Sequence, residues 1–191
     1  MIRKALLVAV LPLAACAHAP AQDDLPALPT QAEMPGPDDS VFPSMMRMGG
    51  EIVDAGGAPI GSLNILAGPN GLLLEATISA GGLSPGWHGL HLHQVGDCAD
   101  VGTFKLSGGH VGKIVGGHGL LNHKGPEGGD LPNIWAAADG SAGYEAFSSL
   151  TTGANLADAD GAALIIHTAR DDHMTQPIGG AGARVACAVI R

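Results

Sequence analysis

The chain has 191 residues, a formal net charge of −9 and a pI near 5.3. This acidic balance argues against a nucleic-acid-binding protein, which needs a basic surface. Thirty glycines, thirteen prolines and only 3% aromatic residues argue against a helical bundle and favour short strands joined by tight turns. Hydrophobic residues make up 46% of the chain, enough for a buried core, and the nine histidines are unusually many.

Residues 1–16 have the features of an export signal. Arg3 and Lys4 precede the apolar run Ala5–Leu13, which is shorter than the roughly 20 apolar residues that span a bilayer. An ordinary cleaved secretion signal, cut within residues 15–17, is one interpretation. Both this and the alternative below predict an exported protein.

The alternative interpretation is a lipoprotein signal. The run Leu13-Ala14-Ala15-Cys16 resembles a bacterial lipobox, whose cysteine becomes the lipidated first residue of the mature chain. Several acyl chains on Cys16 would anchor the protein stably to a membrane. Because Ala17 rather than aspartate follows Cys16, the resemblance favours sorting to the outer membrane, facing the periplasm.

The three cysteines fit this interpretation. Lipidation of Cys16 leaves Cys98 and Cys187 as an even pair in an oxidising compartment, where a disulfide persists. Such a bridge closes a loop of about 90 residues, which contributes about 4–5 kcal/mol in the chain-entropy model. The sequence therefore predicts a Cys98–Cys187 disulfide.

The mature chain divides into a linker and one folded domain. Residues 17–44 are rich in Pro, Ala and Asp and show no periodicity, which indicates an extended linker. Residues 45–191 carry strand patterns and turn signals. We expect about eight short strands in an antiparallel sandwich or barrel, including strands at 63–66, 72–79, 133–138, 142–149, 163–167 and 184–190.

Two local signals support these strands. Residues 74–79 alternate strictly between apolar and polar, as in a half-buried strand, and Gly68-Pro69-Asn70-Gly71 predicts a hairpin turn before them. Asp139-Gly140 predicts a second hairpin turn. Residues 95–132 are different, because they are rich in glycine and lack periodicity, and a loop of this length in a compact domain is usually functional.

Histidines gather on one predicted strand and around this loop. Residues two apart on a strand share a face, so His91 and His93 point together to the face opposite Leu90 and Leu92. Two adjacent imidazoles form a chelating pair for copper or zinc, although exposed strand histidines would show the same pattern. His110, His118 and Asp130 follow in the loop, and His167 ends the later apolar run Leu164–Ile166, which places it at the end of a strand.

The sequence resembles the copper/zinc superoxide dismutase family across about residues 45–191. The segments that carry the resemblance are His88–Cys98, the loop motifs Gly108–His110, His118-Gly119 and Gly129–Asn133, and the C-terminal run Gly180–Ile190. The resemblance implies an eight-stranded antiparallel Greek-key sandwich or barrel with a long metal-binding loop. It also implies an enzyme that converts two superoxide anions and two protons to dioxygen and hydrogen peroxide.

The resemblance assigns roles to individual residues. It implies copper bound by His91, His93, His110 and His167, with His110 also facing zinc, and zinc bound by His118 and Asp130 as well. Asp171 corresponds to the carboxylate that joins a copper-ligand histidine to a zinc-ligand histidine, and His88 to a structural histidine. Arg184 corresponds to the arginine that guides the substrate anion, His110 acts in proton transfer, and Cys98 and Cys187 correspond to the family's disulfide.

One position departs from the family pattern. Nine residues after His118 and three before Asp130, the family has a third zinc-ligand histidine, and this chain has Glu127. A glutamate oxygen can replace it as a ligand, or Glu127 stays in solvent and zinc binds weakly. His123 lies four residues earlier and does not match the register.

Two further function classes remain open. A non-catalytic exported copper- or zinc-binding protein would need the histidines but not Arg184, and a structural or adhesive surface domain would leave the histidines unexplained. The predicted partners are superoxide, a membrane through Cys16 and, as an open option, a second copy in a homodimer. No nucleic-acid partner is expected.

Overall fold

The computed structural model of the chain describes residues 45–191. The predicted signal segment with Cys16 and the linker over 17–44 lie outside these residues. Within 45–191, one four-residue α-helix, α1 (Gly153–Leu156), and one 3-10 turn (Lys105–Ser107) accompany nine strands. No helix in this part of the chain is long and apolar enough to cross a membrane.

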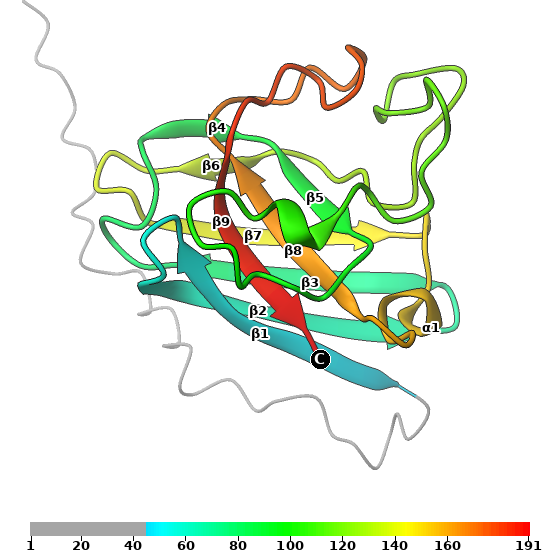
Figure 1. Ribbon diagram of the computed structural model, residues 1–191, viewed down its shortest axis with the longest axis horizontal. Coiled ribbons are helices and arrows are strands. Elements are labelled where there is room, and N and C mark those ends of the chain that lie inside the picture. Colours follow the sequence, from blue (N-terminus) through cyan, green and yellow to red (C-terminus); the bar gives the residue numbers. More distant parts are fainter. Residues whose placement is uncertain (1–44) are drawn as a thin grey trace, which may run out of the picture. The chain divides into compact units, whose positions relative to one another are not determined.

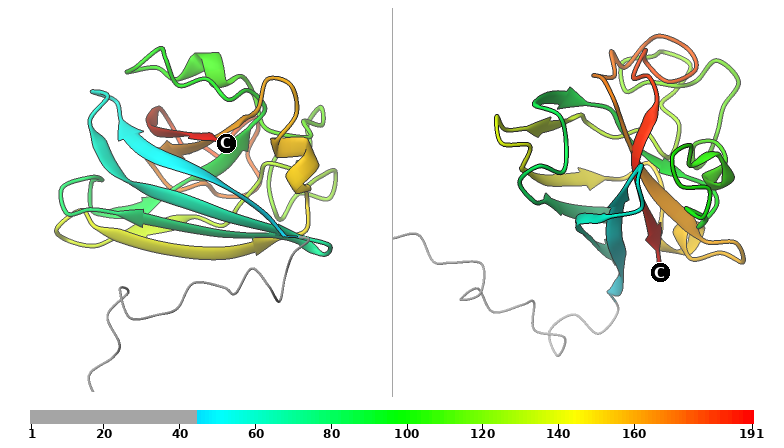
Figure 2. Two further views of the ribbon diagram at one scale, coloured as in Figure 1. Left: turned by 90° about the horizontal axis from the view of Figure 1, so that it is seen from below. Right: turned by 60° about the vertical axis from the view of Figure 1, so that its left-hand side comes forward.

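Nearly all regular structure is antiparallel sheet (Figure 1). Seven strands form one sheet in the order β5-β8-β9-β1-β2-β3-β7, and β4 pairs with β6 in a second, two-stranded sheet. Figure 2 shows the large sheet curling around a common interior. The predicted all-β fold is thus confirmed. The strands are β1 (Met46–Asp54), β2 (Pro59–Gly68), β3 (Gly71–Ile78), β4 (Gly86–His88), β5 (Leu90–His93), β6 (Ile134–Ala136), β7 (Ala142–Ser148), β8 (Ala162–His167) and β9 (Arg184–Ile190).

The β2–β3 hairpin shows why the sequence folds this way. Gly68 pairs with Gly71, so Pro69 and Asn70 form the two-residue turn that the sequence predicts. Along β3 the apolar side chains alternate inward, with Leu72, Leu74, Ala76 and Ile78 all buried in the main core. Period-two patterning therefore sets which face of this strand packs inward.

The predicted histidine strand is two strands that belong to different sheets. His88 pairs with Ile134 in β6, whereas Leu90 pairs with Ile166 in β8. The change occurs at Gly89, where an added Cβ would lie 2.8 Å from Ala181 Cβ. This division raises the strand number from the predicted eight to nine.

The long loop between β5 and β6, residues 94–133, is attached to β5 by backbone hydrogen bonds. The Val111 N–H donates to Leu92 O and the Leu92 N–H donates to Gly129 O, each at 2.9 Å. Gly129 permits this approach because a Cβ there would lie 2.1 Å from Leu92 O. The loop therefore pairs along the edge of β5 opposite β8 and brings its own side chains to the histidine face.

A disulfide attaches the same loop to β9. Cys98 and Cys187 are bonded, with their Cα atoms 6.0 Å apart and a sequence separation of 89, which confirms the predicted pairing. Phe104 is fully buried in the small cluster beside this disulfide. In Figure 1 this part of the loop crosses in front of β8 and β9, which it covers.

Candidate metal centre

Four buried histidines converge where β5, β8 and the long loop meet. His91 and His93 lie on β5, His167 ends β8, and His110 lies in the loop opposite His93. Each is at most 3% exposed. The ring centroids of His91 and His110 lie 4.3 Å apart and those of His91 and His167 lie 4.9 Å apart. The structure thus brings together all four predicted copper ligands.

A hydrogen bond fixes one nitrogen of each ring. Two rings donate to carboxylates: His91 Nε2 to Asp171 Oδ2 at 2.7 Å, and His110 Nδ1 to Glu127 Oε2 at 2.8 Å. The other two donate to backbone carbonyls: His93 Nδ1 to Gly108 O at 2.9 Å, and His167 Nδ1 to Gly182 O at 3.0 Å. Such partners set the tautomer and orientation of metal-binding histidines.

The remaining nitrogen of each ring has no partner. Within residues 45–191, five buried side-chain nitrogens lack a hydrogen bond, and four of them are His91 Nδ1, His93 Nε2, His110 Nε2 and His167 Nε2. Ligand nitrogens of His91, His93 and His167 lie within 4.8 Å of one another. A buried polar atom without a partner is costly, so this set of neutral nitrogens fits copper, which favours imidazole ligands.

Burial keeps three of these rings neutral. Desolvation lowers the pKa of His91 to about 3, that of His93 to about 2 and that of His167 to about 4, from an ordinary value of 6.5. The positive charge of Arg184 contributes further to the low pKa of His93. A neutral imidazole is the form that binds a metal ion, so these rings are ready to act as ligands at neutral pH.

A second group of ligand atoms lies beside the first and shares His110. One atom each from His110, His118, Glu127 and Asp130 lies within 4.8 Å of the others, and all four residues are buried. His118 Nδ1 lies 2.8 Å from Asp130 Oδ1, and His110 Nδ1 lies 3.3 Å from the same oxygen. Two nitrogens and two carboxylate oxygens fit a four-coordinate zinc site.

Glu127 occupies the position of the missing family histidine. Its side chain is 3% exposed, Oε2 faces His110, and Oε1 accepts a hydrogen bond of 3.0 Å from the Ile114 N–H. The alternative that Glu127 stays in solvent is therefore wrong. His123, by contrast, is exposed and belongs to none of the groups of potential metal ligands among the described residues.

Asp171 joins the two groups. Its carboxylate accepts from His91 Nε2 at 2.7 Å and lies 3.3 Å from His118 Nε2. Burial alone would raise the pKa of Asp171, but hydrogen bonds from His118 and His91 outweigh it and hold that pKa well below its usual range. For His118, burial lowers the pKa, but Asp130 and Asp171 outweigh it and raise the pKa to about 9. The carboxylate therefore stays charged and connects the predicted copper and zinc ligands.

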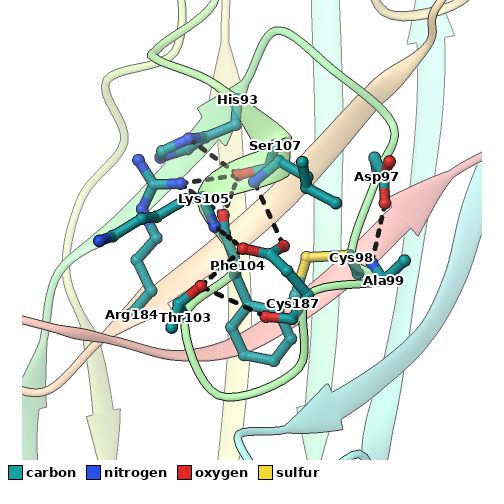
Figure 3. Close-up of a disulfide and its surroundings, with 12 residues drawn as sticks. His93, Asp97, Cys98, Ala99, Thr103, Phe104, Lys105, Ser107, Arg184 and Cys187 are labelled. Atoms are coloured by element: carbon teal, nitrogen blue, oxygen red, sulfur yellow. Dashed lines mark hydrogen bonds between the residues drawn. A yellow bond between two sulfur atoms is a disulfide. The ribbon is translucent and has the colours of Figure 1, made fainter.

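Arg184 lies beside the four-histidine group at the start of β9 (Figure 3). Its guanidinium donates to Phe104 O and Ser107 Oγ from Nη1, and to Gly108 O from Nη2 at 2.8 Å. Gly108 O also accepts the N–H of His93. The loop thus positions the arginine and a predicted copper ligand through the same carbonyl group.

A pocket of about 360 Å³ opens onto Arg184 and His167. Thr103, Lys105 and Ile178 also line it, so two cations face the pocket. A small anion entering here meets Arg184 and His167. Arginine suits this task because it is always charged and presents several donors in a fixed plane.

The contacts of His88 fit its assigned structural role, because Nδ1 lies 2.7 Å from His167 O and Nε2 lies 2.8 Å from Ser84 O. Sequence reasoning missed other supporting groups. The roles of Ser107 and of the Phe104 carbonyl were not predicted, because a backbone carbonyl in an aperiodic loop leaves no pattern in sequence. Asn133 ends the loop motif Gly129–Asn133, but nothing in that motif shows which groups its side chain contacts.

Fold and site together define a class: an antiparallel β protein with a four-imidazole metal site adjoining a mixed imidazole–carboxylate site. The family model for copper/zinc superoxide dismutase matches residues 60–190. A copper/zinc superoxide dismutase of Caulobacter vibrioides is 48% identical over 148 residues, which cover 73% of this chain and 83% of that protein. The chain belongs to the copper/zinc superoxide dismutase family, whose members are oxidoreductases that use copper and zinc.

Solved structures agree with this assignment. The copper/zinc superoxide dismutase of Brucella abortus has a TM-score of 0.62 and 26% identity, covering 78% of this chain and all of that one. A double mutant of a superoxide-dismutase-like protein from Bacillus subtilis has a TM-score of 0.65 and 33% identity, covering 74% of this chain and 95% of that one. A second curated relative, from Aquifex aeolicus, is 35% identical over 156 residues, covering 78% of this chain and 90% of that protein.

Proposed function

We propose that this chain dismutates superoxide, converting two superoxide anions and two protons to dioxygen and hydrogen peroxide. The observation that carries the proposal is the convergence of four buried, unpartnered imidazole nitrogens beside the guanidinium of Arg184. Copper held by His91, His93, His110 and His167 would supply the one-electron couple that dismutation of two superoxide anions needs.

The protein's own residues prepare the site for this exchange. Asp171, Gly108 O and Gly182 O hold His91, His93 and His167 in the tautomers that leave a lone pair facing inward. Because these rings are fixed before a metal binds, the ligands need to move little when the charge of the metal changes.

Arg184 binds the substrate anion. The whole chain carries −9, so its overall charge repels superoxide and attraction has to be local. Arg184 and Lys105 supply that attraction at the pocket. When His110 Nε2 does not hold the metal, it could take a proton from solvent and pass it to the reduced substrate, since that nitrogen is buried and has no hydrogen-bond partner.

A pair of variants tests the division of roles. His93→Ala removes a copper ligand, so we expect copper loss and no dismutation. Arg184→Ala keeps the ligands, so we expect full copper content, a reduced rate and a weaker dependence of the rate on salt. Copper content by mass spectrometry and superoxide decay after a radiolysis pulse measure both. Loss of copper from both variants would show that Arg184 is structural.

The alternative is a non-catalytic, exported copper- and zinc-binding protein. It predicts that the copper-loaded wild type binds metal in the same ligands but does not accelerate superoxide decay. The pulse measurement on the wild type therefore discriminates the two functions directly.

We propose that zinc binds His110, His118, Glu127 and Asp130. Support comes from the burial of all four residues and from the proximity of their ligand atoms. Zinc has no redox chemistry, so its contribution is to hold His110 and the long loop in place and to offset the two carboxylate charges.

We also propose export and lipid attachment at Cys16, with the protein held at the outer membrane and facing the periplasm. Support comes from the lipobox-like run that ends at Cys16. Cys16→Ala should move the protein from the membrane fraction to the soluble periplasmic fraction. A mature chain that begins at another residue, or that keeps a free Cys16 thiol, would contradict the proposal.

We propose, finally, a homodimer formed through Trp87 and Trp135. These residues pair across β4 and β6 with ring centroids 5.1 Å apart, and they are 45% and 53% exposed. Exposed tryptophans are enriched in interfaces, and a two-fold dimer would cover this patch with its own copy. Analytical sedimentation tests this: Trp135→Ser should dissociate the dimer. Leu121→Ser, which changes an exposed loop residue, is the control and should leave the dimer intact. A monomeric wild type would overturn the proposal.

A further inference from the structure

His173 lies next to the metal centre, in the segment between β8 and β9, and none of the metal-ligand groups found within residues 45–191 includes it. Its Nδ1 is the fifth buried side-chain nitrogen without a hydrogen bond among residues 45–191. Its backbone φ of 61° is in the left-handed region, which residues with side chains adopt rarely. An unpartnered ring atom on an unusual backbone indicates a specific local requirement.

Asn133 determines which nitrogen of His173 carries the proton. The Asn133 Oδ1 accepts from the Asp171 N–H at 2.8 Å, so the other end of this amide is the NH₂ group. That group donates to Asp171 O at 2.9 Å and lies 3.0 Å from His173 Nε2. His173 Nε2 is therefore an acceptor, and in a neutral ring the proton lies on Nδ1.

The protonated Nδ1 faces the carboxylate that joins the two metal-ligand groups. It lies 3.8 Å from Asp171 Oδ2, the oxygen that also accepts from His91. The backbone N–H of His173 donates to the other oxygen, Oδ1, at 2.6 Å. Ring and backbone of one residue thus face both oxygens of Asp171.

The same residue supports the zinc-side loop. The Leu121 N–H donates to His173 O at 3.2 Å. Gly119, adjacent to His118, packs so closely against this carbonyl that an added Cβ would lie 2.1 Å from it. The left-handed conformation of His173 lets its N–H point to Asp171 while its carbonyl points to the loop.

We propose that His173 is a positioning residue that, together with Asn133, holds the Asp171 carboxylate between His91 and His118 and so controls how firmly the zinc-side ligands retain metal. His173 touches neither substrate nor a metal ligand atom, and it acts only through Asp171. The inference rests on the proposed metal function but makes a separate claim about the metal-free protein, in which the same hydrogen bonds exist.

Two variants keep the backbone and change only the ring. His173→Gly removes both ring nitrogens, and glycine adopts positive φ freely. His173→Asn also tolerates this conformation and keeps a donor near the position of Nδ1. His123→Gly is the control, since it removes an exposed histidine from the metal-binding loop between β5 and β6.

Two measurements on the full chain read out the effect. In the metal-free protein, imidazole-optimised NMR follows solvent exchange of the His91 and His118 Nε2–H protons that face Asp171. In the zinc-loaded protein, transfer of zinc to a chromogenic chelator gives the release rate. We expect His173→Gly to increase the rate of proton exchange and the rate of zinc release by about tenfold or more, the scale measured for outer-shell partners of metal ligands. His173→Asn should recover most of the loss, and His123→Gly should match the wild type.

The outcomes separate the two claims. Wild-type rates of proton exchange and zinc release in His173→Gly overturn the role of His173. Equal defects in His173→Gly and His173→Asn also overturn it, because the ring donor then has no specific effect. A wild type that binds no zinc, with fast proton exchange only in His173→Gly, supports the positioning role and contradicts the proposed zinc site.

Discussion

Three carboxylates are buried among the histidines of the metal centre: Glu127, Asp130 and Asp171. A buried charge is tolerated only when it is paired or hydrogen-bonded, and backbone N–H groups meet part of this need here. Asp130 Oδ2 accepts from the N–H groups of Gly119 and Glu127, each at 2.8 Å. Burial raises the pKa of Asp130 and of Asp171, but their hydrogen bonds outweigh it and hold both pKa values below the usual range. These two carboxylates therefore stay ionised without metal, and their negative charge attracts a divalent cation.

The first prediction concerns Glu127. Glu127→Gln keeps the size of the side chain and an acceptor for the Ile114 N–H, but it removes the charge that faces His110. We expect zinc affinity to fall by about tenfold or more, whereas Glu127→His should retain zinc because imidazole is a good ligand.

Zinc content after dialysis measures the first effect. Both substitutions also remove a negative charge near the copper ligands, so the reduction potential of bound copper should rise. Unchanged zinc content and an unchanged potential in both variants would exclude Glu127 from the zinc site.

At the scale of elements, the site exists because the aperiodic loop is attached to two strands. Backbone pairing through Leu92 places His110 and Asp130 beside β5, and the disulfide with its neighbour Phe104 places loop carbonyls beside Arg184. Each attachment serves a different part of the site. Breaking them one at a time should therefore have separable effects.

A methyl group at Gly129 tests the attachment to β5. Gly129→Ala puts Cβ 2.1 Å from Leu92 O, so the loop has to move away. We expect loss of zinc and a decrease of more than about 2 kcal/mol in the free energy of unfolding, because two backbone hydrogen bonds of about 1 kcal/mol each are lost. Gly143→Ala on β7 is the matched control, since an added Cβ there meets nothing within 4 Å; equal effects of the two substitutions would contradict this account.

Removing the disulfide tests the attachment to β9. In the double variant Cys98→Ser/Cys187→Ser, the free energy of unfolding should fall by about 4–5 kcal/mol, as the chain-entropy model gives for a loop of this length. The carbonyl groups that hold Arg184 should also become less ordered, so the rate should fall more than copper content. Urea unfolding and metal analysis test both, and an unchanged rate at full copper content would show that Arg184 is positioned without the disulfide.

At the scale of the whole molecule, the metal-free site makes stability depend on pH in two opposite ways. His91, His93 and His167 have pKa values lowered to about 3, 2 and 4, so an unfolded chain binds protons below about pH 6.5 that the folded chain does not. Their contribution is present above pH 6.5 and is lost as the pH falls toward those values. The pKa of His118 is raised to about 9, so its contribution is present below pH 6.5 and is lost as the pH rises through 9.

We therefore expect the metal-free protein to be most stable near pH 6.5 and to lose stability on both sides. Urea unfolding midpoints between pH 4 and 10 measure this. With metal bound, the alkaline loss should disappear, because a metal ion replaces the proton on His118. A midpoint that stays constant from pH 4 to 7 in the metal-free protein would contradict the assignment of neutral buried rings.

Local patterns in the sequence determined the antiparallel strands, the β2–β3 turn and the order of the histidines along the chain. Period-two alternation and the Pro-Asn turn depend on neighbouring residues only, so they can be recognised without a structure. The chain also turns at Asp139-Gly140, but the strands on either side pair with β4 and β3 and form no hairpin with each other. His91 and His93 were predictable as a pair for the same reason.

Tertiary structure alone decided the rest. Three features were not predictable from the sequence: the division of the histidine strand at Gly89, the burial of Glu127 and the contacts of Asn133. Each depends on residues that lie far apart in the sequence. These contacts depend on the path of a loop without periodicity, where backbone carbonyls and glycine clearances set the geometry. The path of such a loop cannot be predicted from the order of its side chains.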